Sequence, residues 1–122
     1  MAKNVLVKWT DDVYDYDFQV HRCPLVGFQK KYQFADGKAL TMDGSVGVTF
    51  EVEGENGRTV IMWFDPSISP SSTDGMSAIA HEAFHAACRV FNKTGVVLSE
   101  ASEEAYAYYL SFITAKVVEA LS

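Results

Sequence analysis

Two histidines and a glutamate stand close together in the string His81-Glu82-Ala83-Phe84-His85. On a helix, residues four apart lie on one face about one turn apart, so a helical conformation brings both imidazoles within reach of one ion. Zinc suits such a pair, because imidazole is a good zinc ligand and tetrahedral geometry leaves a position for water. The string therefore predicts a zinc site with His81 and His85 as ligands.

Glu82 directly follows the first of these two ligands, so we expect it to flank the ion instead of binding it. From there it can take a proton from a water molecule that zinc activates, since zinc lowers the pKa of a bound water to about 7. The chemistry that these residue types predict is hydrolysis by metal-activated water, with Glu82 as the general base.

A catalytic zinc site needs a third protein ligand. The only other histidine in the sequence, His21, lies in the half predicted to form β structure. The alternative is a carboxylate near the start of the last predicted helix, where Glu100, Glu103 and Glu104 stand close together. Cys88, one turn after the second histidine, could approach the metal, but packing between helices is the better interpretation of this small side chain. The residue types alone leave the third ligand open.

The HExxH string falls inside a helix with clear start and stop signals. Hydroxyls at residues 71–73 can cap its first N–H groups, Asp74 adds favourable charge there, and Gly95 is a natural C-terminal stop. A second helix is expected to begin near Ser99 and to run to the last residue. The small side chains of Ala86 and Ala87 would let this second helix come close to the first.

The first half of the chain predicts a sheet. The clearest signal is a hairpin in which apolar residues alternate before turn residues at 54–57. The run that follows at 59–64 is apolar on both faces, which predicts an inner strand or a covered edge strand. Residues 24–40 fit a helix or a strand equally well. A sheet followed by two helices packed on it is an α+β arrangement. Strands are expected at 5–9, 13–20, 46–53 and 58–64.

The composition is that of one globular domain spanning residues 1–122, with 48% hydrophobic and 21% charged residues. The net charge of -6 disfavours nucleic acid and anionic membranes as partners. No apolar run reaches the roughly 20 residues of a membrane span, and no signal-peptide pattern is present. Two cysteines, Cys23 and Cys88, are too few for a disulfide framework, so we expect free thiols and a cytoplasmic location.

The two strings on the predicted helices resemble the gluzincin metallopeptidases. In that family the HExxH helix is followed by a glutamate helix with strings such as NEGFAEYL, and here HEAFH is followed by EEAYAYYL at residues 103–110. Laid on that string, Glu104 takes the ligand position and Glu103 takes the preceding Asn position. Glu104 lies 19 residues after His85 (104 − 85), close to the gluzincin spacing. The resemblance covers roughly residues 60–115.

The resemblance implies a zincin-like α+β fold: a small N-terminal, mainly antiparallel sheet packed by the HExxH helix and a C-terminal glutamate helix. It implies a zinc peptidase with His81, His85 and Glu104 as ligands, acting on a peptide or protein substrate that could add to the strand at 59–64. The chain is similar to minimal, single-domain gluzincins associated with phage and prophage genomes, which would place it in a host cytoplasm.

Two questions stay open at the level of sequence. Larger gluzincins add a Tyr or His that stabilises the oxyanion; Tyr106, Tyr108 and His21 are candidates, although aromatic packing or a core role is the commoner use of such residues. The rival function is a non-catalytic, zinc-stabilised interaction or inhibitor protein on a zincin scaffold. A closed site with Cys88 or His21 as fourth ligand would favour that rival.

Overall fold

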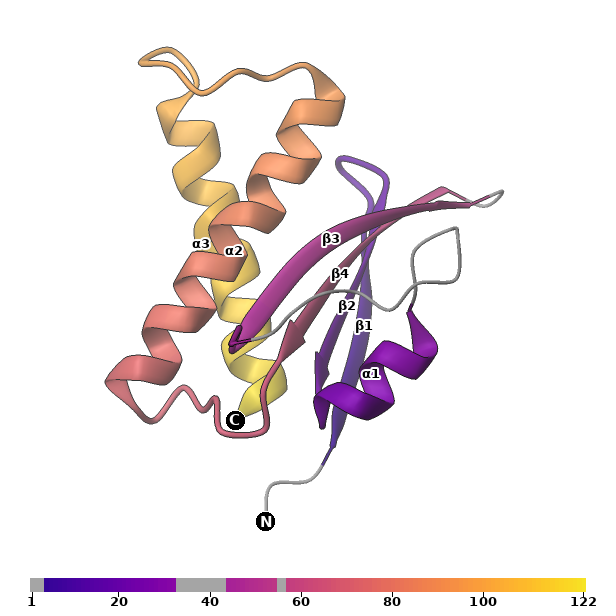
Figure 1. The fold of residues 1–122 in the computed structure, drawn as a ribbon. Helices are drawn as coiled ribbons and strands as arrows, with labels where there is room; N and C mark the ends of the chain where they lie inside the picture. Colours follow the sequence, from indigo (N-terminus) through magenta and orange to yellow (C-terminus); the bar gives the residue numbers. More distant parts are fainter. Residues whose placement is uncertain (1–3, 33–43, 55–56) are drawn as a thin grey trace.

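A computed structural model describes residues 4–32, 44–54 and 57–122 of the chain. The sheet strands precede the two long helices in the sequence, which confirms the α+β prediction (Figure 1). The elements are, in chain order, β1 (Val5–Asp11), β2 (Tyr16–Arg22), α1 (Leu25–Lys31), β3 (Gly47–Gly54), β4 (Gly57–Phe64), α2 (Thr73–Thr94) and α3 (Glu103–Leu121).

The four strands lie side by side in the order β1-β2-β4-β3. β1 pairs with β2 and β3 pairs with β4 in antiparallel fashion, whereas β2 and β4 are parallel. The sheet is therefore mixed, although two of its three pairings have the antiparallel direction that was expected. The predicted hairpin is confirmed, with Val52 opposite Thr59, and β4 is the inner strand that its apolar run predicts.

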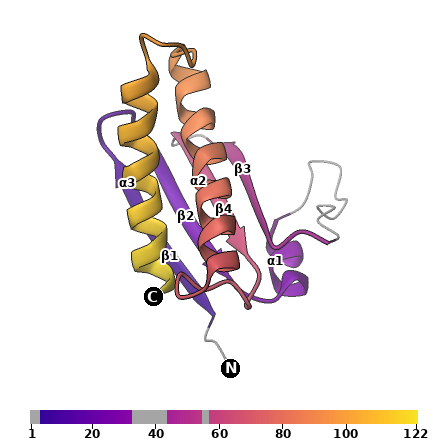
Figure 2. The ribbon, with the colours of Figure 1, turned by 90° about the vertical axis from the view of Figure 1, so that its left-hand side faces the viewer.

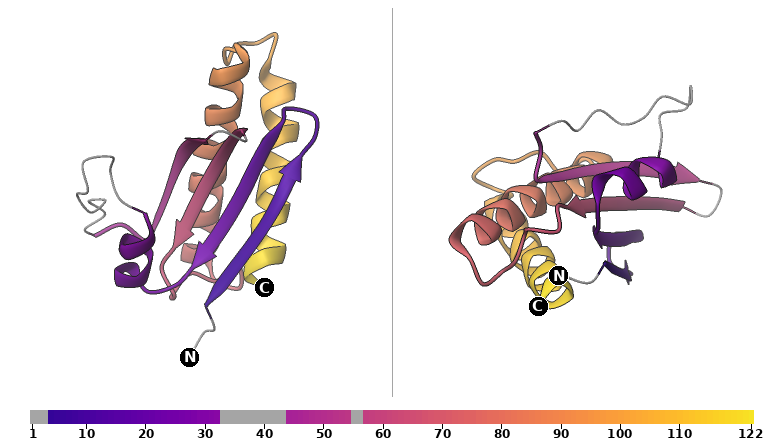
Figure 3. Two further views of the ribbon diagram at one scale, coloured as in Figure 1. Left: turned by 90° about the vertical axis from the view of Figure 1, so that its right-hand side faces the viewer. Right: turned by 60° about the horizontal axis from the view of Figure 1, so that its bottom comes forward.

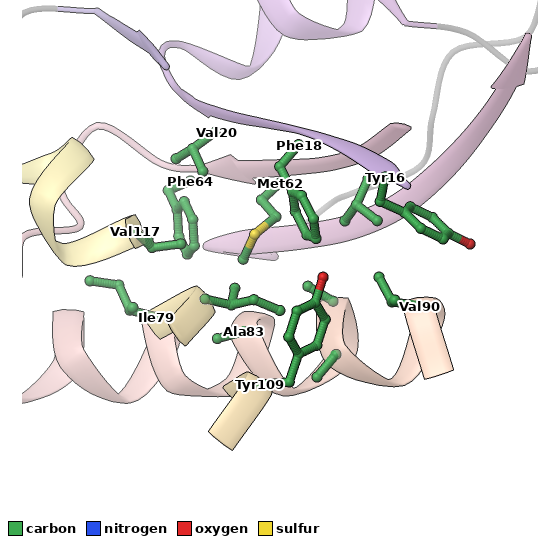
Figure 4. Packing of buried hydrophobic residues seen from close by; sticks show 14 of the residues in the cluster. Tyr16, Phe18, Val20, Met62, Phe64, Ile79, Ala83, Val90, Tyr109 and Val117 are labelled. Atoms are coloured by element: carbon green, nitrogen blue, oxygen red, sulfur yellow. The ribbon is translucent and has the colours of Figure 1, made fainter. Parts of the chain in front are cut away.

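The two faces of the sheet are covered by different helices. α2 and α3 run antiparallel across one face, and α1 lies against the other (Figures 2 and 3). Alternate residues of β2 and β4 point into the main core with the long helices, and the intervening residues of β4 pack against Phe28 of α1. Figure 4 shows the main core, in which the strands contribute Tyr16, Phe18, Val20, Met62 and Phe64, and the helices contribute Ile79, Ala83, Val90, Tyr109 and Val117.

The predicted start and stop of the HExxH helix are confirmed. The Ser72 side-chain oxygen accepts a hydrogen bond from the Gly75 N–H at 3.0 Å and caps the first turn of α2. Gly95 ends the helix in the left-handed conformation, with φ of 80°. Among the described residues, no helix is long and apolar enough to cross a membrane.

Two predicted boundaries were wrong by more than two residues, both because a polar side chain bonds to its local backbone. β2 begins at Tyr16 instead of residue 13, because the Asp11 carboxylate accepts the Val13 N–H at 2.9 Å and forms a turn. α3 begins at Glu103 instead of near Ser99, because the Ser102 hydroxyl accepts the Ser99 N–H at 2.9 Å and so holds a turn ahead of the helix. In the ambiguous segment 24–40, residues 25–31 are helical, and residues 33–40 lie outside the described ranges.

Candidate metal centre

The structure brings the two predicted histidine ligands together. His81 and His85 lie one turn apart on α2, both exposed, with their Nε2 atoms 3.1 Å apart. Two nitrogens bound to one tetrahedral zinc at its usual bond length are about 3.3 Å apart. The two imidazoles therefore already have nearly the spacing that a shared zinc ion requires, and as donors they fit it.

Glu82 lies beside this pair but turns toward the sheet. Its side chain is buried, with 7% of the residue exposed. One carboxylate oxygen, Oε1, accepts a hydrogen bond from the Thr49 hydroxyl of β3 at 2.7 Å. The other, Oε2, lies 3.8 Å from His81 Nε2. The carboxylate thus flanks the histidine pair, as the sequence predicts.

β3 is the strand that borders the histidine helix. Its helix-facing residues include Gly47, Thr49 and Glu51, and a Cβ added at Gly47 would meet Glu82 Cγ at 3.0 Å. The expectation that a peptide adds to the strand at 59–64 was wrong, because those residues belong to β4, whose two edges are occupied by β2 and β3. The strand edge nearest to the histidines is that of β3.

The third ligand predicted from the gluzincin resemblance is not brought to the pair. In the described part of the chain, no group of three or more His, Cys, Asp or Glu side chains is placed to hold a metal ion. Glu104 is exposed in the first turn of α3, next to Tyr106, whose ring packs on Phe91 with centroids 4.5 Å apart. Phe91 lies six residues beyond His85, which is about 9 Å along a helix. Glu104 therefore stands near the far end of α2.

The other ligand candidates on or near the two long helices are Glu103, Glu100 and Cys88. Glu103 shares the first turn of α3 with Glu104, and Glu100 precedes that turn. Cys88 is half-buried and packs against the main core, which is the packing role expected of it. Burial raises the pKa of the Cys88 thiol, which disfavours the thiolate that a metal needs.

His21 is excluded as a ligand of this site by its place on the sheet. It belongs to β2 but packs edge-on against Phe28 and Tyr32 on the α1 side, so the sheet separates it from α2. Only 4% of His21 is exposed, and its Nε2 lies 3.0 Å from Gln19 Oε1. Burial, with smaller contributions from two nearby lysines, lowers the pKa of His21 to about 4. His21 is a neutral core histidine at physiological pH.

Of the two tyrosine candidates for oxyanion stabilisation, one bonds to the loop after α2 and the other is exposed. The Tyr106 hydroxyl donates to the Val96 carbonyl at 2.6 Å and is used to hold the loop after α2. Tyr108 is 75% exposed on α3. Thr49, which bonds to Glu82, and Gly47, which leaves room for its side chain, were not predicted. Their alternation along β3 was visible in the sequence, but the face that meets α2 was not.

Comparison of the chain with protein-family models, curated proteins and solved structures gives no match. The gluzincin resemblance therefore rests on the HExxH string and the glutamate string.

Proposed function

We propose that this chain is a zinc-dependent peptide hydrolase of gluzincin type with a zincin-like fold. The observation that carries the proposal is the 3.1 Å separation of the Nε2 atoms of His81 and His85 on the exposed face of α2, with a buried carboxylate from the intervening residue Glu82. An isolated surface histidine pair needs no such carboxylate, whereas hydrolysis needs a proton acceptor next to the metal.

His81 and His85 would hold the ion, and the resemblance assigns the third ligand to Glu104. When bound, zinc would polarise the peptide carbonyl and lower the pKa of the attacking water. Glu82 would serve as the proton acceptor for that water and as the proton donor to the departing amine nitrogen. The position that supports this role is that of Oε2, 3.8 Å from His81 Nε2.

An extended peptide is the substrate that the sheet edge favours. β3 is an edge strand, so one row of its backbone N–H and C=O groups has no partner strand among the described residues. A peptide that pairs with these groups would lie along the edge of the sheet formed by β3, the strand whose Thr49 bonds to α2. The substrate's backbone would then be bound close to the histidine pair.

A non-catalytic, zinc-stabilised interaction or inhibitor protein is the second candidate. It is favoured by one observation: within the described ranges, only two of the side chains suited to hold a metal come together. Two imidazoles can bind an ion without forming a catalytic site. The role of Glu82 separates the two candidates, because binding does not need a proton acceptor.

The test combines metal content with hydrolysis of a fluorescently labelled unfolded protein such as casein. We expect one zinc per chain after purification without chelators, and its loss in His81→Ala and His85→Ala. Glu82→Gln should keep the zinc and the circular dichroism spectrum but lower the hydrolysis rate by at least 10²- to 10⁴-fold, since Gln cannot accept the proton. A metal-free wild-type protein contradicts both the peptidase and the zinc-stabilised interaction protein. A biological effect of the protein that persists in Glu82→Gln supports the interaction protein, because that effect does not need the proton acceptor.

A further inference from the structure

The bond between α2 and the edge strand determines which way the Glu82 carboxylate points. A buried carboxylate needs hydrogen-bond donors, and Thr49 of β3 supplies one to Oε1 at 2.7 Å. The same hydroxyl lies 3.3 Å from the backbone carbonyl of Glu82, so Thr49 contacts both ends of this residue. The conformation of the Glu82 side chain is therefore set from the strand and not from its own helix.

Gly47, two residues earlier on β3, leaves room for that conformation. A methyl group at this position would lie 3.0 Å from Glu82 Cγ and 3.4 Å from a ring carbon of Phe64. The first distance is shorter than ordinary van der Waals contact, so a side chain here would push the Glu82 stem away from the strand. Thr49 and Gly47 together form a slot in which the Glu82 side chain lies.

The slot has a chemical consequence for a metal bound by the histidines. A carboxylate is itself a good zinc ligand, and Oε2 of Glu82 lies only 3.8 Å from His81 Nε2. If the carboxylate bound the ion, the proton acceptor would be lost. Thr49 holds Oε1 toward the strand, which leaves Oε2 as the oxygen on the histidine side.

We infer that Thr49, with Gly47, is a positioning residue that keeps Glu82 a general base and prevents it from becoming a zinc ligand. This inference rests on the proposed function. Thr49→Val removes the hydroxyl and keeps the branched shape, whereas Thr49→Ser keeps the hydroxyl and is the matched control. The measurements are zinc affinity by competition with a chelator, the visible spectrum of the Co²⁺-loaded protein, and casein hydrolysis.

In Thr49→Val we expect zinc to bind at least as tightly as in wild type, the Co²⁺ spectrum to change as the carboxylate joins the ion, and hydrolysis to fall by about 10- to 100-fold. Thr49→Ser should behave as wild type. In a Glu82→Gln background, Thr49→Val should leave both the spectrum and the zinc affinity unchanged, because no carboxylate remains to move. A purely structural role for Thr49 would not depend on Glu82 in this way.

Gly47→Ala provides a second variant in case Thr49→Val does not fold. It keeps the hydroxyl but fills the slot, and we expect retained zinc with reduced hydrolysis. A wild-type spectrum and wild-type hydrolysis in Thr49→Val, or an equal spectral change in the Glu82→Gln background, overturn the positioning role alone. A wild-type protein that binds neither Zn²⁺ nor Co²⁺ overturns the proposed function and the positioning role together.

Discussion

His21, the buried histidine on the α1 side of the sheet, makes folding depend on pH. Burial lowers its pKa in the folded chain to about 4, against about 6.5 in an unfolded chain. Between these values the unfolded chain binds a proton that the folded chain does not. His21 therefore has no effect on the pH dependence above about pH 6.5. As the pH falls from there toward 4, the free energy of unfolding decreases by up to about 1.4 kcal/mol per pH unit.

The prediction is tested by urea unfolding of wild type and His21→Gln between pH 7.5 and 5. Gln removes the titrating group, so the free energy of unfolding should depend less steeply on pH in the variant, whatever its absolute stability. Equal slopes in the two proteins would show that another group is responsible for the pH dependence.

Glu104 is the residue for which the family resemblance and the geometry disagree. The resemblance predicts that Glu104→Gln releases zinc more readily than Glu103→Gln or Glu100→Gln. The structure places Glu104 near the far end of α2, so this outcome requires the first turn of α3 to approach His85. Zinc titration of the three variants decides the matter. If all three retain zinc equally, the Glu104 assignment is wrong and the third ligand lies elsewhere.

At the scale of elements, α2 depends on a glycine at its C-terminal end. Gly95 has φ of 80°, and an added Cβ would meet no atom within 4 Å, so a substitution acts through backbone strain alone. Gly95→Ala should lower the free energy of unfolding by about 1 kcal/mol. Gly27 of α1 is the matched control: it also has open space around it but no positive φ. Gly27→Ala should stabilise the protein by about 0.5–1 kcal/mol. Thermal unfolding that shifts both variants in the same direction would contradict the strain argument.

At the scale of the whole molecule, one arginine ties together three distant parts of the chain. Arg22 at the end of β2 donates from Nη1 to the Ile68 carbonyl at 2.9 Å and to the Leu121 carbonyl at 3.1 Å. It therefore joins the sheet to the loop before α2 and to the last turn of α3. We expect Arg22→Ala to cost about 1.5–3 kcal/mol in urea unfolding, because hydrogen bonds from a charged donor are the stronger ones. Arg22→Lys should recover part of the lost free energy of unfolding. If Arg22→Ala costs less than about 0.5 kcal/mol, these hydrogen bonds contribute no more than ordinary surface contacts.

Local chemistry made much of this protein predictable from its sequence. The histidine pair follows from helical periodicity, since residues four apart share a face whatever the helix packs against. Ser72 and Gly95 bound α2 through hydrogen bonds and dihedral angles that involve only near neighbours. The hairpin of β3 and β4 follows from alternation and turn residues in the same way. Interactions between residues close together in the sequence can therefore be predicted from the local sequence pattern.

Contacts between distant residues were decided only by the tertiary structure. Alternation along β3 shows that Gly47 and Thr49 share a face, but only the packing of the sheet on α2 brings that face to Glu82. Likewise, aromatic packing of Phe91 on Tyr106 sets the position of α3 along α2, and with it the distance from Glu104 to the histidines. A helix can slide against its neighbour by a turn without changing its own hydrogen bonds, so only side-chain packing across the interface determines which residues meet.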